Sequence, residues 1–184
     1  MKSLFCVGFA LLVQGCASTM SYKEPTQGDR ARVRFTTNTE DVAVLRSYDD
    51  ASCTVNESEW MRLRVGPLVA SAPKRMGMPL WNHHENAAKE VYVSSAKPYT
   101  FLFAGSVREG LTARLCGVPL TYTFDANKDY QLDYIQTGQS CTAVVSELAG
   151  AGDTGSKVAL KTYDNRVTPG NAGCLEQFRK ARWQ

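Results

Sequence analysis

The strongest constraint on the fold is a two-residue alternation of apolar and polar side chains, which recurs along the chain from residue 31 onward. In the first such stretch, Ala31, Val33 and Phe35 fall on one side of an extended backbone, with polar side chains between them. Successive side chains of a strand point to opposite faces, so this period indicates half-buried strands of antiparallel sheets. The alternation recurs at residues 61–65, 119–124, 130–136 and 157–161, and further strands are expected at 42–48, 90–95, 99–104, 111–115 and 142–148.

Short segments rich in glycine and proline separate several of these strands, as at Gly66-Pro67, Gly105-Ser106 and residues 150–155. One short helix is expected near the C-terminus, where apolar side chains punctuate charged ones after Gly173. Many short strands with frequent turns favour an all-β fold. We therefore expect an antiparallel β-sandwich, immunoglobulin- or transthyretin-like in appearance, with a short C-terminal helix and two disulfides.

The first fifteen residues have the composition of a secretion signal. Lys2 gives a positive start, and residues 4–13 follow without a charge. As a helix this apolar stretch would span only about half of a ~30 Å hydrocarbon core. The pattern therefore predicts a segment that is removed after export.

Residues 12–16, Leu-Val-Gln-Gly-Cys, resemble the lipobox of bacterial lipoproteins, in which a small residue precedes the cysteine. Gly15 and Cys16 match that pattern, and Gln14 stands where a small residue is usual. The resemblance implies that Cys16 is diacylglycerylated, that a type II signal peptidase cleaves before it, and that the new N-terminus is acylated. Such chains anchor a protein firmly, because each buried methylene contributes about 0.8 kcal/mol. Ala17 and Ser18 follow in place of the aspartate that retains lipoproteins in the inner membrane, which implies an outer-membrane protein facing the periplasm.

These observations divide the chain into three parts. Residues 1–15 are the cleaved signal, residues 16–30 are the lipidated cysteine and an aperiodic tether, and residues 31–184 are one β-sandwich domain.

The cysteines fit an oxidising compartment. Cys6 leaves with the signal and Cys16 carries lipid, so four cysteines remain to form two disulfides. Strands 119–124 and 130–136 are expected to form a hairpin, which would place Cys116 opposite residue 138, close to Cys141. We therefore predict the pairs Cys116–Cys141 and Cys53–Cys174, the second fastening the C-terminal helix to the domain.

Composition and motifs argue against several functions. The chain carries 21 Lys and Arg against 18 Asp and Glu, with the signs interspersed, so no nucleic-acid partner is expected. Nucleophile elbows, zinc-protease motifs and phosphate-binding loops are missing from the sequence, so no catalytic residue and no cofactor is nominated. Arg32, Arg34, Arg62 and Arg64 could form a basic strip, although a solvated sheet face is the simpler interpretation.

Two segments imitate metal sites. Residues 125–133 begin like a calcium-binding EF-hand loop, but Tyr130 and Gln136 replace the glycine and glutamate that such a loop requires. His83 and His84 are adjacent, and on a strand adjacent side chains point to opposite faces. No metal is therefore expected at either segment.

The segment 66–89 is the longest stretch without a clear period. It combines Pro and Gly punctuation with Met76, Met78, Trp81, His83 and His84. Long irregular loops are often functional, and methionine and aromatic residues are common at interfaces. The segment is the candidate recognition loop, with the alternative that its Met and Trp side chains only close the end of the sandwich.

The function expected from these features is a lipid-anchored, non-enzymatic accessory or binding module. Its membrane contact is the N-terminal lipid, and its partner is an unknown envelope protein or cell-wall component. Two alternatives stay open: a periplasmic inhibitor or immunity lipoprotein, and an envelope hydrolase.

Overall fold

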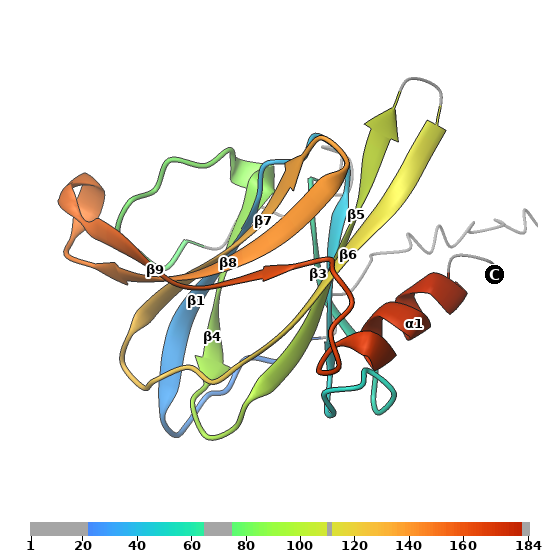
Figure 1. Cartoon of the computed structure of the whole chain (residues 1–184). Helices are drawn as coiled ribbons and strands as arrows, with labels where there is room; N and C mark the ends of the chain where they lie inside the picture. The colour runs from blue at the N-terminus through green and yellow to red at the C-terminus, as the bar shows by residue number, and fades with distance from the viewer. Residues whose placement is uncertain (1–21, 65–74, 110–111, 182–184) are drawn as a thin grey trace, which may run out of the picture.

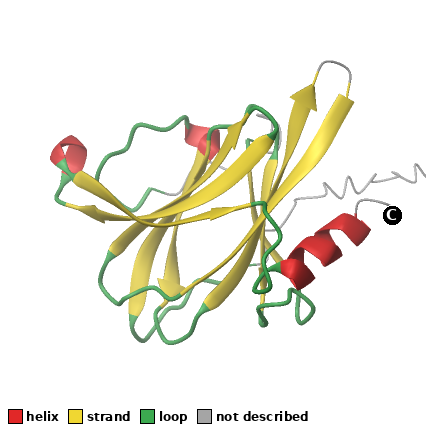
Figure 2. Ribbon diagram, viewed as in Figure 1, coloured by secondary structure: helices red, strands yellow, loops and turns green. Residues whose placement is uncertain are grey.

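The fold consists of two β-sheets packed face to face, with one helix at the C-terminal end (Figures 1 and 2). The computed structural model describes residues 22–64, 75–109 and 112–181. The predicted signal and Cys16 lie outside these residues, as do residues 66–74 of the candidate loop and its Gly66-Pro67 turn. In the described residues the expected β-sandwich with a short C-terminal helix and two disulfides is confirmed.

The larger sheet has five strands in the order β4-β1-β7-β8-β9. It is mixed and not purely antiparallel, because β1 and β7 run parallel while every other neighbouring pair is antiparallel. Its strands are β1 (Arg30–Thr37), β4 (Ala88–Ser94), β7 (Asp129–Thr137), β8 (Ser140–Ala149) and β9 (Ser156–Asp164).

The smaller sheet has four antiparallel strands in the order β3-β2-β5-β6. They are β2 (Ala43–Tyr48), β3 (Ser58–Leu63), β5 (Tyr99–Glu109) and β6 (Thr112–Tyr122). Two short 3-10 helices, η1 (Glu85–Ala87) and η2 (Gly152–Thr154), and the helix α1 (Ala172–Ala181) complete the described elements.

The alternating apolar residues meet between the sheets. Val33 and Phe35 of β1 and Leu132 of β7 face Phe101 and Phe103 of β5, and all five side chains are fully buried. Phe35 packs edge-on against Phe101, with ring centroids 5.6 Å apart. The two-residue period therefore identified the core face of these strands correctly.

The predicted hairpin between residues 119–124 and 130–136 is wrong. β6 belongs to the smaller sheet, where it pairs with β5, whereas β7 belongs to the larger sheet, between β1 and β8. Residues 123–128 cross from one sheet to the other. Alternation reports which face of a strand is buried and does not report which strand is its neighbour. A six-residue connection can therefore look like a hairpin loop and join two sheets.

The predicted turn at Gly105-Ser106 is also wrong, because β5 continues through it to Glu109. Gly105 is a strand residue paired with both Ala43 and Cys116. A Cβ at position 105 would lie 2.9 Å from Tyr134 Cε1 of the opposite sheet. Glycine therefore stands here because an aromatic ring approaches the backbone closely.

Both predicted disulfides are present. Cys116 of β6 and Cys141 of β8 have Cα atoms 6.2 Å apart and join the two sheets. Cys53 and Cys174 have Cα atoms 4.7 Å apart and join the loop after β2 to α1. The first pair was predicted correctly from an incorrect hairpin, since the two cysteines meet across the sandwich.

The chain before β1 already contacts the domain. Tyr22, which lies within the predicted tether, stacks on Trp60 with ring centroids 3.7 Å apart. Its hydroxyl donates to the carbonyl oxygen of Tyr92 at 2.7 Å. The packed part of the chain therefore includes Tyr22.

Candidate functional site

Residues 75–84 of the candidate loop lie across the outer face of the larger sheet. We call residues 75–84 the strap. In Figure 1 the green connection that precedes η1 arches over toward the turn between β8 and β9. Leu80 N donates to the carbonyl oxygen of Gly152 in that turn at 2.8 Å. The strap thus spans the sheet from the β4 side to the β8–β9 connection.

Two arginine side chains of β1 donate hydrogen bonds to backbone carbonyl oxygens of the strap. Arg32 Nη1 donates to the carbonyl oxygen of Met76 at 3.0 Å. Arg34 Nη2 and Nη1 donate to the carbonyl oxygens of Met78 and Leu80, each at 3.1 Å. Two guanidinium groups of β1 therefore bind the carbonyl oxygen of every second residue from Met76 to Leu80.

Arg34 is the centre of this arrangement and is 0% exposed. Its Nε and Nη2 donate to Glu90 Oε1 on β4 at 2.9 and 2.7 Å, and its Nη1 also donates to Gln131 Oε1 on β7 at 3.1 Å. Glu90 Oε2 accepts a short hydrogen bond from the backbone N of Met76. Glu90, Arg34 and Gln131 are direct neighbours across β4, β1 and β7. The register of the sheet therefore brings these three side chains together.

The four arginines considered for a solvated basic strip do not form one. Arg34 is buried, and Arg32 forms a two-bond ion pair with Asp129 at 2.6 Å. Arg62 lies on the other sheet and pairs with Glu59, and the buried Nε of Arg64 has no hydrogen-bond partner. The alternation assigned these side chains to the face away from the core. The alternation did not indicate that a loop 44 to 46 residues further along the chain covers Arg32 and Arg34.

A second group of polar side chains continues under the strap. Asp133 accepts hydrogen bonds from Thr36 and Gln131 at Oδ1 and from Lys157 at Oδ2, each at 2.6 Å. The hydroxyl of Ser146, next to Gln131 on β8, is buried without a hydrogen-bond partner. The outer face of the sheet therefore carries a connected polar network from β4 to β9.

His83 lies at the edge of this network and is half-buried. Its Nε2 is 3.4 Å from Gln131 Oε1. Burial lowers the pKa of His83 below its ordinary value of 6.5, and the positive charges of Arg34 and Lys157 act in the same direction, against the Gln131 hydrogen bond and Asp133. His83 is therefore predominantly neutral at neutral pH.

The structure separates the five candidate recognition residues. Met78 is 4% exposed and Met76 is half-buried, so the two methionines do not form an exposed apolar patch. Trp81 is partly exposed, and Arg75 lies over its ring at 4.3 Å from the centroid. His84 is exposed, whereas His83 turns toward the network. The strap thus buries one part of the candidate set and presents Trp81 and His84.

The carboxylates of residues 125–133 are each engaged with a different cation. Asp125 pairs with Lys128 at 3.2 Å, Asp129 with Arg32, and Asp133 with Lys157. Asp129 and Asp133 lie on β7, so these groups do not converge as calcium ligands would. Across the described ranges, no cluster of three or more His, Cys, Asp or Glu side chains is arranged to hold a metal.

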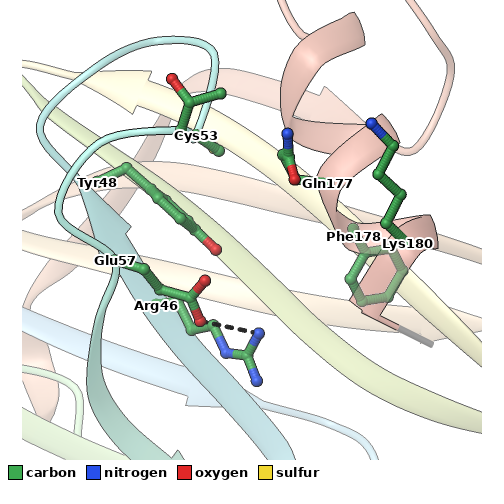
Figure 3. A pocket seen from close by; sticks show the side chains of 8 residues that line it. Arg46, Tyr48, Cys53, Glu57, Gln177, Phe178 and Lys180 are labelled. Atoms are coloured by element: carbon green, nitrogen blue, oxygen red, sulfur yellow. Dashed lines mark ion pairs between the residues drawn. The ribbon is translucent and has the colours of Figure 1, made fainter. Parts of the chain in front are cut away.

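A separate pocket, which the sequence did not indicate, lies between β2, the loop after it and α1 (Figure 3). Its volume is about 330 Å³, and its lining includes Arg46, Tyr48, Glu57, Phe178 and Lys180. Arg46 pairs with Glu57 at 3.1 Å, and burial, followed by the charge of Glu57, raises the pKa of Tyr48 to about 12. The Cys53–Cys174 disulfide joins the segments that form this pocket. The predicted pairing of these cysteines was therefore the sequence feature from which the pocket could have been inferred.

The polar groups of the described site hold the strap in position. His83 contacts the amide of Gln131, and Cys53, Cys116, Cys141 and Cys174 are all oxidised. The charged groups under the strap bind its backbone and each other. The arrangement can fix one loop conformation and present its outer side chains.

No family model, curated protein or solved structure matches this chain. No helix within residues 22–64, 75–109 and 112–181 has the length and apolar character that crossing a membrane requires.

Proposed function

We propose that this chain is a lipid-anchored, non-enzymatic binding protein of the bacterial envelope, and that the strap is its recognition element. The observation that carries the proposal is the hydrogen bonding of Met76, Met78 and Leu80 carbonyls by Arg32 and Arg34. These bonds fix the backbone of an irregular loop on a rigid sheet, and a loop held in one conformation loses less entropy when it binds.

The energetics of the strap support a role beyond covering the sheet. Burying the Arg34–Glu90 pair requires both charges to leave water, and apolar side chains of similar volume often stabilise a fold as well or better. A buried ion pair that also binds the loop backbone instead selects one geometry. We infer that the network under the strap defines the position of Trp81 and His84.

The exposed part of the strap has the chemistry of a contact surface. Trp81 lies beside Arg75, and tryptophan and arginine are among the residues that contribute most to binding energy at interfaces. His84 adds an exposed side chain that can donate or accept a hydrogen bond. The partner is an envelope protein or a cell-wall component.

The location rests on the N-terminal sequence and agrees with the disulfides. Residues 12–16 match the lipobox pattern apart from Gln14, and Ala17 and Ser18 favour the outer membrane over the inner. Two disulfides indicate an oxidising compartment. We therefore propose lipid attachment at Cys16 with the domain in the periplasm.

A periplasmic inhibitor is the second candidate function, and the rigid strap favours it. Complexes between hydrolases and their inhibitors change little in backbone on binding, so an inhibitory loop is held in its bound shape beforehand. The strap fits that requirement through its three bound carbonyls. If the captured partner is a hydrolase, loss of its activity in the complex separates inhibition from simple attachment.

Photocrosslinking in intact envelopes tests the proposal. A photoreactive phenylalanine derivative replaces Trp81 in the full-length protein, and the matched control carries it at Lys97, which is exposed in the turn between β4 and β5. The proposal predicts one dominant adduct from position 81 that is missing from position 97. The same adducts from both positions, or none from position 81, would contradict it.

A further inference from the structure

One edge of the larger sheet is exposed along almost its whole length. β9 pairs with β8 on one side and is the last strand of its sheet. Residues 156–162 are all exposed, and Val158 and Leu160 are 59% and 45% exposed. Both faces of β9 are therefore accessible as well as its edge.

The other three sheet edges in the described part of the chain are less exposed. β3 and β4 are partly or fully buried at nearly every position. β6 is exposed from Thr112 to Leu115, but it is buried from Cys116 to Leu120, and its Pro119 has no backbone N–H to donate. β9 contains no proline, so its backbone groups can continue the hydrogen-bond ladder of the sheet.

The charges on β9 determine which strand can add to it. Lys157 and Lys161 stand four residues apart, the first against Asp133 at 2.6 Å and the second over the Tyr163 ring at 4.7 Å. The register shift at Val145/Ser146 places the two lysines on opposite faces, Lys157 on the outer face and Lys161 on the face toward the smaller sheet. Residues 156–162 carry no Asp or Glu, so a segment that pairs with this edge meets one lysine on each face. Like charges across neighbouring strands are destabilising, so a basic segment is disfavoured there.

We propose that β9 is a docking edge for an extended acidic segment of another polypeptide, which adds as a sixth strand to the larger sheet. Main-chain hydrogen bonds supply the affinity of such strand addition, and alternate side chains supply its specificity. Acidic side chains on the two faces of the incoming segment meet Lys157 and Lys161, and neighbouring apolar ones cover Val158 and Leu160. This edge adjoins the network under the strap through Lys157, but the proposal does not rest on the strap's proposed role.

Synthetic peptides test the charge preference with the acylated full-length protein in detergent micelles. Three labelled nine-residue peptides with blocked ends carry Glu, Ser or Lys at two positions on each face of the extended chain and Val or Thr at the other positions. Fluorescence anisotropy should show that the Ser peptide binds about tenfold more weakly than the Glu peptide and that the Lys peptide binds weakest. Equal binding of all three peptides, or binding of none, would overturn the proposal.

Backbone methylation separates strand addition from simple charge attraction. Two further Glu peptides are N-methylated at alternate residues, one along each edge. Methylation of the edge that faces β9 should abolish binding, and methylation of the other edge should leave it nearly unchanged. If both methylated peptides bind like the parent, no strand is added.

Single charge reversals locate the site on the protein. Lys161→Glu should weaken the Glu peptide and strengthen the Lys peptide, whereas Lys97→Glu, a reversal at an exposed lysine of the β4–β5 turn, should change neither. Unchanged binding by Lys161→Glu would place the peptide elsewhere and refute the assignment. A concentration-dependent dimer that Leu160→Lys abolishes would show that a second copy occupies β9, which would refute it equally.

Discussion

Arg34 uses all five of its N–H donors without contact with solvent. Two go to Glu90, one to Gln131 and two to carbonyl oxygens of the strap. The guanidinium geometry suits this task, because its donors lie in one plane with fixed directions. A single buried side chain therefore couples β4, β1, β7 and the loop above them.

Removing one partner of this pair should destabilise the domain strongly. Glu90→Gln keeps the shape and leaves the Arg34 charge buried without its counter-ion, so we expect a loss of about 3–5 kcal/mol in the free energy of unfolding. Urea unfolding followed by tryptophan fluorescence measures it. The matched control is Glu59→Gln, which breaks the exposed ion pair with Arg62 and should cost about 1 kcal/mol or less. Equal losses in the two variants would show that burial of the pair has no energetic consequence.

The lowered pKa of His83 predicts a pH-dependent stability. Below its ordinary pKa of 6.5, the unfolded chain binds a proton that the folded chain resists, because burial disfavours the charged imidazole. Stability from this group is therefore complete above that value and is lost as the pH falls toward the lower folded pKa. His83→Gln should melt with a smaller decrease between pH 7 and pH 5 than the wild type. The control His84→Gln, at the exposed neighbour, should keep the wild-type dependence, and a wild-type slope in His83→Gln would rule the explanation out.

At the scale of elements, the sequence pattern predicted the strands and the buried face of the central ones, and it failed on neighbours and on β9, where the alternating Val158 and Leu160 are exposed. The alternation at Val33 and Phe35 identified a buried face correctly, because burial follows from the two-residue period itself. The pairing of β1 with β7 and the crossing of residues 123–128 between sheets depend on contacts between distant segments, which no local pattern records. Gly105 was misread for the same reason, since the ring that requires it comes from the opposite sheet.

The candidate site was likewise predicted only in part from the sequence. Met78 and Trp81 were identified from an irregular, methionine- and tryptophan-containing segment, and that segment does form a distinct feature. Which of its side chains is buried depends on the arginines beneath it. Arg34 was assigned to a solvated face because charged side chains are rarely buried, and the sequence gives no sign that Glu90 stands opposite it.

Helix α1 should depend on its disulfide. Ten residues are too few for a stable isolated helix, and α1 is held by Cys53–Cys174 and by Phe178, which lies against Gly117. In the chain-entropy model a cross-link over 121 residues stabilises the fold by about 5 kcal/mol, compared with about 3.5 kcal/mol for the 25-residue separation of Cys116–Cys141.

We therefore predict that Cys53→Ser/Cys174→Ser exposes the segment before α1 to limited proteolysis while the sandwich remains folded. Cys116→Ser/Cys141→Ser serves as the comparison, and it should lower the melting temperature without early cleavage near the C-terminus. The same cleavage pattern in both double variants would show that Cys53–Cys174 does not specifically hold the helix.

At the scale of the whole molecule, the account joins a rigid domain to a lipid anchor. Cys16→Ser should abolish acylation and release the protein from membranes, because acyl chains on Cys16 are the proposed membrane contact. Globomycin should likewise cause the uncleaved precursor to accumulate. Fractionation with a salt wash, followed by mass spectrometry of the N-terminal peptide, measures both effects. Retention of Cys16→Ser on salt-washed membranes would overturn the proposed anchor.

The central claim is that the strap recognises a partner through its exposed side chains and that its buried residues only hold it in place. The most direct measurement is partner capture from crosslinked envelopes by Trp81→Ala and by Met78→Ala, each paired with a thermal melt. Because Trp81 is partly exposed and Met78 is 4% exposed, the two substitutions separate contact from support. The Arg34 guanidinium also lies 5.2 Å from the centroid of the Trp81 ring. The account therefore predicts that Trp81→Ala loses capture with only a small decrease in melting temperature, while Met78→Ala causes a larger decrease, as the loss of about 2–5 kcal/mol typical of truncating a buried methionine would. Full capture by Trp81→Ala together with a sharply lowered melting temperature would show that the strap is a structural cover and would contradict the claim.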